Sequence, residues 1–205
     1  MTVEQELKPL FLIDVDGVVN AWPRVPDEDY HYIQSFGMRV AVHSETLEAL
    51  RVLSGLANEI LWLSAWREKA NHEINTYLSA EIDQWPISLG VITDGGSEMD
   101  RDFSTEWKLK AMQTDERVTK AKVERREVVW IEDFGFDYGA FGRQYMKEVE
   151  ATGVTAIDTT RRGYLMSSDL RVAGLIRTPM EQIEEAAKGS LGVKAIVMKG
   201  RAWRQ

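Results

Sequence analysis

The stretch that decides the fold of this chain is FLIDVDGVVN, which occupies residues 11–20. Large apolar residues typical of a buried strand stop abruptly at two carboxylates, Asp14 and Asp16, and Gly17 then permits a sharp turn. In a parallel sheet such a junction is the carboxyl end of a strand, where open α/β folds bind their ligands. Two carboxylates this close repel each other unless a cation lies between them. The stretch therefore indicates a site for a hard divalent ion such as Mg²⁺.

The Asp-Val-Asp-Gly motif at residues 14–17 has a second interpretation. Asp-x-Asp-Gly also occurs in calcium-binding loops and in ordinary acidic turns that follow a strand. The apolar approach to Asp14, together with polar residues that follow the later strands, favours the catalytic interpretation.

The composition is that of a globular protein with one full domain. Its 205 residues are 44% hydrophobic and 28% charged. The lack of cysteine excludes disulfides, thiolate metal sites and cysteine nucleophiles, and it suits a cytoplasmic location. The polar start is unlike a signal peptide, and no apolar run reaches the ~20 residues of a membrane span, so no membrane association is expected.

The charge pattern bears on possible partners. A formal net charge of −8 disfavours a generic nucleic-acid coat, because binding to a phosphate backbone relies on Lys and Arg. Basic residues nevertheless gather in residues 106–126 and in the C-terminal tail. They form either a local basic site or a solvated helix face, and the sequence leaves both open. It predicts no oligomeric state.

Strands and helices alternate along the chain. Strands are expected at 8–13, 59–63, 87–92, 127–131 and 154–157, with a hairpin or flap inside 18–42. Helices are expected at 45–57 after a Ser44 cap, at 68–82, around Trp107 and Lys108, and at 138–152, 168–177 and 179–188. This alternation predicts an α/β fold: a Rossmann-like, doubly wound, mostly parallel sheet with helices on both faces. We expect a domain at 1–188, including the flap, and a tail at 189–205 with an edge strand near 193–198.

Polar residues follow four of the predicted strands. Asp14 and Asp16 follow the first strand, Ser64 follows the second, and Lys108 lies near the start of the helix after the third. The fourth strand leads into the acidic pair Glu132-Asp133, with Asp137 beyond. Because the carboxyl ends of parallel strands meet at one edge, these groups are expected to converge.

This order of motifs resembles the haloacid-dehalogenase-like (HAD) phosphohydrolase superfamily over residues 8–165. The resemblance implies the HAD-like version of the predicted fold, here with a minimal cap. A finer likeness lies in LSAWREKAN, residues 63–71, and WIED, residues 130–133. These are similar to the HAD domain of Swiss Army Knife RNA repair proteins and to the phosphatase half of polynucleotide kinase-phosphatases. Arg67 is displaced by one inserted residue relative to the usual Ser-Gly-Arg.

The resemblance implies catalytic roles for four residues. Asp14 would attack phosphorus to form an aspartyl-phosphate, and Asp16 would protonate the leaving alkoxide and later activate water. Ser64 and Lys108 would contact phosphoryl oxygens, with Lys110 as an alternative to Lys108. Dehalogenases lack an acid at the position of Asp16, so its presence points to phosphate chemistry.

The resemblance also implies a metal and a substrate-binding set. Mg²⁺ would bind Asp14, the backbone carbonyl of Asp16, and the acidic pair Glu132 and Asp133. Glu132 or Asp137 would alternatively orient metal-bound water or Lys108, and Asp137 could simply cap a helix. Arg67 would clamp a second phosphate or the substrate backbone, Ser64 would contact the phosphate, and Trp66 or Trp22 could stack on a base.

Three functions remain as candidates. The short gaps between motifs leave no room for a large cap domain, and an open site suits a bulky phosphorylated substrate. The first candidate is therefore a Mg²⁺-dependent phosphomonoesterase acting on DNA or RNA ends, a polynucleotide phosphatase. A small-molecule phosphatase such as a nucleotidase is the alternative, and a non-catalytic binding module that keeps the fold is the third.

Overall fold

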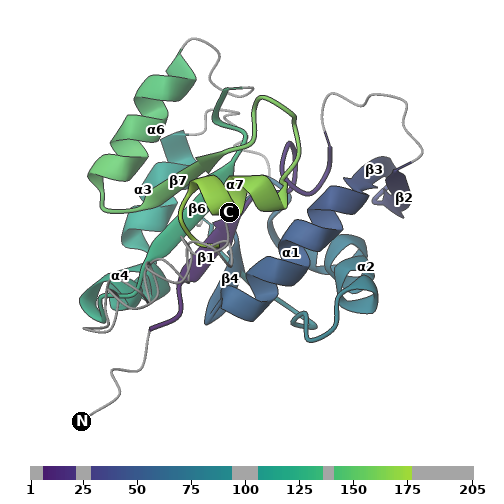
Figure 1. Cartoon of the computed structure of the whole chain (residues 1–205), viewed down its shortest axis with the longest axis horizontal. Helices are drawn as coiled ribbons and strands as arrows, with labels where there is room; N and C mark the ends of the chain where they lie inside the picture. The colour runs from purple at the N-terminus through teal and green to yellow at the C-terminus, as the bar shows by residue number, and fades with distance from the viewer. Residues whose placement is uncertain (1–6, 22–28, 94–105, 136–140, 177–205) are drawn as a thin grey trace, which may run out of the picture. The chain divides into compact units, whose positions relative to one another are not determined.

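The computed structural model describes four stretches of the chain (Figure 1). These are residues 7–21, 29–93, 106–135 and 141–176. The chain divides into two compact units, Met1–Leu170 and Arg171–Gln205, and only 171–176 of the second unit are described. The expected helix at 179–188, the domain boundary after 188 and the edge strand near 193–198 lie outside the described residues.

A five-stranded parallel sheet forms the centre of the first unit. Its order is β5-β4-β1-β6-β7. The strands are β1 (Leu10–Ile13), β4 (Glu59–Trp62), β5 (Gly90–Val91), β6 (Val128–Glu132) and β7 (Thr155–Asp158). The chain moves outward from β1 through β4 to β5, then crosses to the other side of β1 for β6 and β7. Asp14 follows β1 and therefore lies at the switch point of the sheet, where such folds bind ligands.

Helices cover both faces of this sheet (Figure 1). On one face, Leu10, Leu12 and Trp130 belong to a buried cluster that includes residues of α3 (Glu106–Thr114), α4 (Glu116–Val123) and α6 (Gly142–Ala151). The other face carries α1 (Ser44–Leu56), whose buried residues include Leu47, Leu50 and Leu53. Burial on both faces explains why β1 is apolar at every position. The predicted doubly wound α/β fold is confirmed.

A hairpin occupies the predicted flap region. Strands β2 (Tyr30–Ser35) and β3 (Met38–His43) pair antiparallel around Phe36 and Gly37, which both have positive φ, 49° and 76°. Such a two-residue turn suits the twist of a hairpin. The hairpin contacts α2 (Glu73–Glu81), and the Ser35 hydroxyl donates to a Glu73 carboxylate oxygen at 3.2 Å.

Helix α1 differs from its prediction at its first residue. The cap is His43 rather than Ser44, because His43 has extended backbone angles and its Nδ1 accepts from Glu45 N at 3.2 Å.

The segment after β4 differs more. The expected helix at 68–82 is divided into a 3₁₀ turn, η1 (Arg67–Asn71), and α2.

Strand β5 is shorter than the predicted strand at 87–92. The side-chain amide of Asn71 is the physical reason, since it accepts from Leu89 N and donates to Leu89 O. Leu89 therefore meets its hydrogen-bonding needs outside the sheet, and the strand begins at Gly90 instead of residue 87.

The last described helix, α7 (Ser167–Val172), is shorter than the predicted 168–177.

Candidate active site

A buried lysine links the ends of the two central strands. Lys108 on α3 places its Nζ 2.9 Å from Asp14 Oδ2, and 2.9 and 2.8 Å from the two carboxylate oxygens of Glu132. All three residues are at most 4% exposed. The Trp130 indole donates to Glu132 Oε2 at 3.2 Å. Lys110 lies on the exposed side of the same helix, so the structure brings Lys108 rather than Lys110 to Asp14.

The electrostatics of this trio follow from burial and charge. Burial raises the pKa of Asp14, but the Lys108 charge and hydrogen bonds from its neighbours leave that pKa below its ordinary value. Burial and the charge of Asp14 raise the pKa of Glu132 well above its ordinary value, despite Lys108. Burial lowers the pKa of Lys108, yet the two carboxylates outweigh burial and raise it overall. The arrangement keeps Asp14 ionised and Lys108 cationic at neutral pH.

Ser64 lies at the same edge of the sheet. It is fully buried just beyond β4, and its Oγ accepts from Trp66 N at 3.3 Å and Val15 N at 3.4 Å. Val15 N also donates to Asp14 Oδ1 at 2.7 Å. A hydrogen bond from Ser64 contributes to the lowered pKa of Asp14. The hydroxyl predicted to contact phosphate therefore lies beside the predicted nucleophile.

Asp16 is exposed, unlike Asp14. Its Oδ2 accepts from Trp66 Nε1 and its Oδ1 from Asn20 Nδ2, both at 2.7 Å. Surrounding protein that displaces water, together with the charge of Asp14, raises the pKa of Asp16. A raised pKa makes the protonated form more accessible, as a general acid requires.

Asp133 packs against the turn after β1. Gly17 has φ of +72°, and a Cβ built on it would lie 2.3 Å from Asp133 Oδ2. The Thr159 hydroxyl, just beyond β7, donates to Gly17 O at 2.7 Å and contacts Glu132 O at 3.3 Å. These contacts fix the acidic pair beside the Asp14–Asp16 turn.

The donor set fits a hard cation. Among the described residues, no group of three or more His, Asp and Glu side chains is arranged to hold a metal ion. Two carboxylates, Asp14 and Asp133, with one backbone carbonyl nevertheless suit Mg²⁺, which usually keeps several waters. Both oxygens of Glu132 accept from Lys108, and its predicted contact with the metal stays a prediction.

A family model described as the HAD domain in Swiss Army Knife RNA repair proteins matches residues 10–159, more than half of the chain. The chain belongs to this family. It is therefore a HAD-type domain of the phosphohydrolase superfamily. No curated protein and no solved structure matched the chain.

Two further predicted residues of this HAD domain lie just beyond Ser64. The Trp66 indole is only 8% exposed and donates to Asp16, so its geometry does not support the predicted stacking on a base. Arg67 has a positive φ of 50°, donates its N–H to Ser64 O, and places its guanidinium carbon 5.8 Å from the Trp107 ring centroid. Its contact with a phosphate stays a prediction. Asp137 and Trp22 lie outside the described residues.

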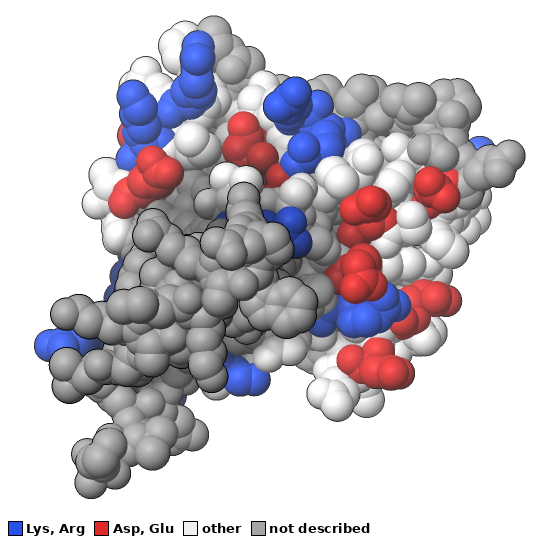
Figure 2. Space-filling model, in the orientation of Figure 1, with Lys and Arg blue, Asp and Glu red and all other residues white. Residues whose placement is uncertain are grey.

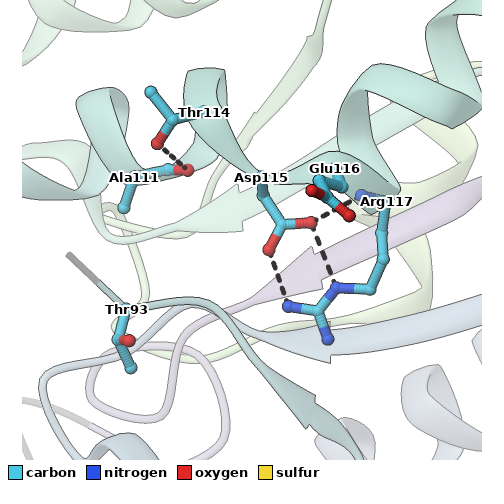
Figure 3. Close-up of a pocket in the computed structure, with 6 residues that line it drawn as sticks. All are labelled: Thr93, Ala111, Thr114, Asp115, Glu116 and Arg117. Carbon is cyan, nitrogen blue, oxygen red and sulfur yellow. Dashed lines mark hydrogen bonds and ion pairs between the residues drawn. The ribbon is translucent and has the colours of Figure 1, made fainter. Parts of the chain in front are cut away.

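A shallow pocket is lined by other residues than these. It has a volume of 440 Å³ and is lined by Thr93 and by residues at the junction of α3 and α4 (Figure 3). None of the residues discussed above as catalytic lines it. Among the described residues, it is at the strand ends that the predicted nucleophile Asp14, the cation Lys108 and the predicted acid Asp16 come together.

Sequence reasoning missed two residues of the site. Asn20 lies within the opening stretch and Thr159 follows a predicted strand, but neither residue type signals chemistry by itself. The position of Thr159 after the fifth strand was the available signal for its place at this edge.

No helix among the described residues is long and apolar enough to cross a membrane.

Proposed function

We propose that this HAD domain is a Mg²⁺-dependent phosphomonoesterase that works through an aspartyl-phosphate and acts on nucleic-acid ends. The observation that carries the proposal is the pairing of Asp14 with Lys108, next to a second, differently tuned carboxyl group on Asp16. Two acidic groups whose pKa values are pushed apart suit division into nucleophile and acid.

The proposed reaction has two steps that share the same side chains. A carboxylate oxygen of Asp14 attacks phosphorus as the bond to the ester oxygen breaks, and Asp16 gives its proton to that leaving oxygen. Water then attacks the phosphorus of the aspartyl-phosphate, with Asp16 taking a proton. Inorganic phosphate leaves and the Asp14 carboxylate is restored.

Other groups stabilise the charge on the transferred phosphoryl group. Lys108 supplies a fixed positive charge and Ser64 a hydroxyl at the same strand ends. Asp14, Asp133 and the Asp16 carbonyl would hold Mg²⁺, which when bound neutralises phosphoryl charge. Glu132 keeps Lys108 in place through its two hydrogen bonds.

The substrate class rests on the family and on access to the site. The matched family is named for RNA repair proteins, and the hairpin β2–β3 is the only strand pair described between β1 and α1. A minimal cap of this kind would suit a bulky end better than a metabolite that needs enclosure. We infer that the phosphate removed is at the end of an RNA or DNA strand.

The charge distribution favours a second candidate, a small-molecule phosphatase such as a nucleotidase. The net charge is −8, and on the face in Figure 2 the described Lys and Arg residues are interspersed with Asp and Glu. A continuous basic track along that face, which would follow a phosphate backbone, is not visible among the described residues.

One experiment separates these candidates. Phosphate release would be measured from a 3′-phosphorylated oligonucleotide, a 5′-phosphorylated one and the matching mononucleotides, with Mg²⁺ and with EDTA. The proposal expects a higher kcat/KM for an oligonucleotide, loss of activity in EDTA, and loss in Asp14→Asn, which keeps the shape but removes the nucleophile. Preference for mononucleotides would support the nucleotidase. No release from any ester would leave a non-catalytic binding module.

A further inference from the structure

The two oxygens of Asp16 each accept a hydrogen bond from a different buried side chain. Trp66 Nε1 lies 2.7 Å from Oδ2, and Asn20 Nδ2 lies 2.7 Å from Oδ1. The donors are 8% and 7% exposed, whereas Asp16 itself is exposed. An exposed carboxyl group would otherwise sample several rotamers, so two short bonds to buried donors restrict it to one.

We propose that Asn20 and Trp66 are positioning residues that aim the Asp16 carboxyl group at the leaving oxygen of the substrate. The proposal rests on the function proposed above, in which Asp16 is the general acid. A carboxylate has about four lone-pair sites, so two accepted bonds leave each oxygen able to meet the reacting group. Misplacement of a reacting group by about 1 Å can reduce a rate by about 100-fold.

The orientation of the Asn20 amide is fixed by the hairpin. Asn20 Oδ1 accepts from Ala41 N at 2.9 Å, and Ala41 is fully buried in β3. A backbone N–H can only donate, so the atom facing it must be the amide oxygen, and the NH₂ group must face Asp16. The backbone of Ala21 also donates to Ala41 O at 2.8 Å. Asn20 therefore links the position of strand β3 to the orientation of the Asp16 carboxyl group.

The orientation of Trp66 is fixed by its own chemistry. An indole N–H can donate but not accept, so it suits a carboxylate or carboxyl oxygen. The backbone N of Trp66 donates to Ser64 Oγ at 3.3 Å. One residue thus contacts both the hydroxyl beside Asp14 and the acid that serves the leaving group.

The leaving group provides a test that a purely structural role would not pass. A general acid matters most when the departing oxygen is strongly basic and least when it is weakly basic. The probes are an alkyl phosphate, glycerol phosphate, and an aryl phosphate, p-nitrophenyl phosphate. We would compare kcat/KM, which reports the steps up to the first irreversible one and is insensitive to slow hydrolysis of the aspartyl-phosphate.

The variants are Trp66→Phe, which keeps the aromatic body and removes the donor, and Asn20→Ala. Each should lower kcat/KM for the alkyl ester by about tenfold to about 100-fold and for the aryl ester by less than about threefold. The matched control is Trp85→Phe. Trp85 is 4% exposed and its Nε1 donates to Asn75 Oδ1 at 2.9 Å, so the substitution removes the same kind of buried bond away from Asp16.

The outcomes are distinct. Selective loss on the alkyl ester in Trp66→Phe, without that selectivity in Trp85→Phe, supports the positioning role. Equal loss on both esters in folded Trp66→Phe overturns it, whatever the folding of Asn20→Ala, while the proposed phosphatase function survives. Failure of the wild-type protein to release phosphate from these two esters and from the oligonucleotides and mononucleotides overturns the phosphatase function, and the positioning role falls with it.

Discussion

Gly17 meets two requirements at the turn that carries the two proposed catalytic aspartates, Asp14 and Asp16. Its φ of +72° belongs to a region that residues with a side chain rarely adopt, and a Cβ there would lie 2.5 Å from Asp133 Cβ. Gly37 in the hairpin turn has nearly the same φ, +76°, but a Cβ added to it would meet nothing within 4 Å. A substitution at Gly37 therefore tests the cost of positive φ alone, whereas one at Gly17 adds a steric clash with Asp133.

We expect Gly17→Ala to lower the free energy of unfolding more than Gly37→Ala does. Positive φ alone should cost about 1–2 kcal/mol in each variant, and the contact with Asp133 adds to that cost in Gly17→Ala. Displacement of Asp133 should also remove most phosphatase activity, whereas Gly37→Ala should keep it. Urea unfolding and phosphate release measure both effects. Equal destabilisation with equal activity would contradict the proposed close packing of Asp133.

At the scale of elements, the start of α4 supports the edge strand β5 through Arg117. Figure 3 shows the Asp115–Arg117 pair that holds this arginine. Asp115 caps α4 by accepting from Arg117 N at 2.8 Å and Val118 N at 3.4 Å. It also binds the Arg117 guanidinium through both oxygens, at 3.0 and 2.7 Å. Arg117 in turn donates to Val91 O at 2.9 Å. Strand β5 has only two residues and so makes few hydrogen bonds with β4. The hydrogen bond from Arg117 to Val91 O therefore adds to the attachment of this strand.

Asp115→Ala should lower the free energy of unfolding by about 1–2 kcal/mol through loss of the cap. Glu116→Ala, at the exposed neighbouring position, should change the free energy of unfolding little.

The effect of Asp115→Ala should also depend on pH. Burial raises the pKa of Asp115, but the bonds from Arg117 outweigh burial and leave the pKa lowered. A lowered folded-state pKa means that this contribution is present above the ordinary pKa and is lost as pH falls through the folded value. The difference from wild type, measured by urea unfolding, should therefore shrink on acidification; a difference that is constant with pH would exclude the carboxylate as its source.

At the scale of the whole molecule, the site concentrates negative charge in a chain that is already acidic, with a net charge of −8. Asp14, Asp16 and Asp133 meet at the end of β1, and Lys108 is shared between Asp14 and Glu132. A ligand that binds only the folded state stabilises it by mass action. A divalent cation at this site is therefore expected to stabilise the entire fold.

Mg²⁺ should raise the thermal midpoint of the wild-type protein. At 100 times its dissociation constant the gain corresponds to about 2.7 kcal/mol. Asp133→Asn should lose most of this gain because it removes one anionic ligand, while Asp83→Asn, at an exposed position, should keep it. A thermal melt with Mg²⁺ and with EDTA measures the shift. The same Mg²⁺-dependent gain in Asp133→Asn and wild type would place the cation elsewhere.

Much of the fold was predictable because its signals are local. Apolar runs that end in polar residues predicted the strands of the parallel sheet, and the positive-φ turn at Gly17 fits the expected sharp turn after Asp16. The broken helix after β4 was not predictable, because the break accompanies hydrogen bonds that Asn71 makes with Leu89, far along the chain. The length of β5 depends on the same contacts.

The sequence by itself determined the class of fold and the edge of the sheet at which acidic groups gather, since strand period and strand ends are set by neighbouring residues. Only the tertiary structure decided which side chains meet there. It selected Lys108 over Lys110, because two residues along a helix point to different sides. It turned Glu132 toward that lysine and brought Trp66 to Asp16. Partners such as Asp14 and Lys108 lie 94 residues apart in sequence, so their contact depends on how helices pack on the sheet.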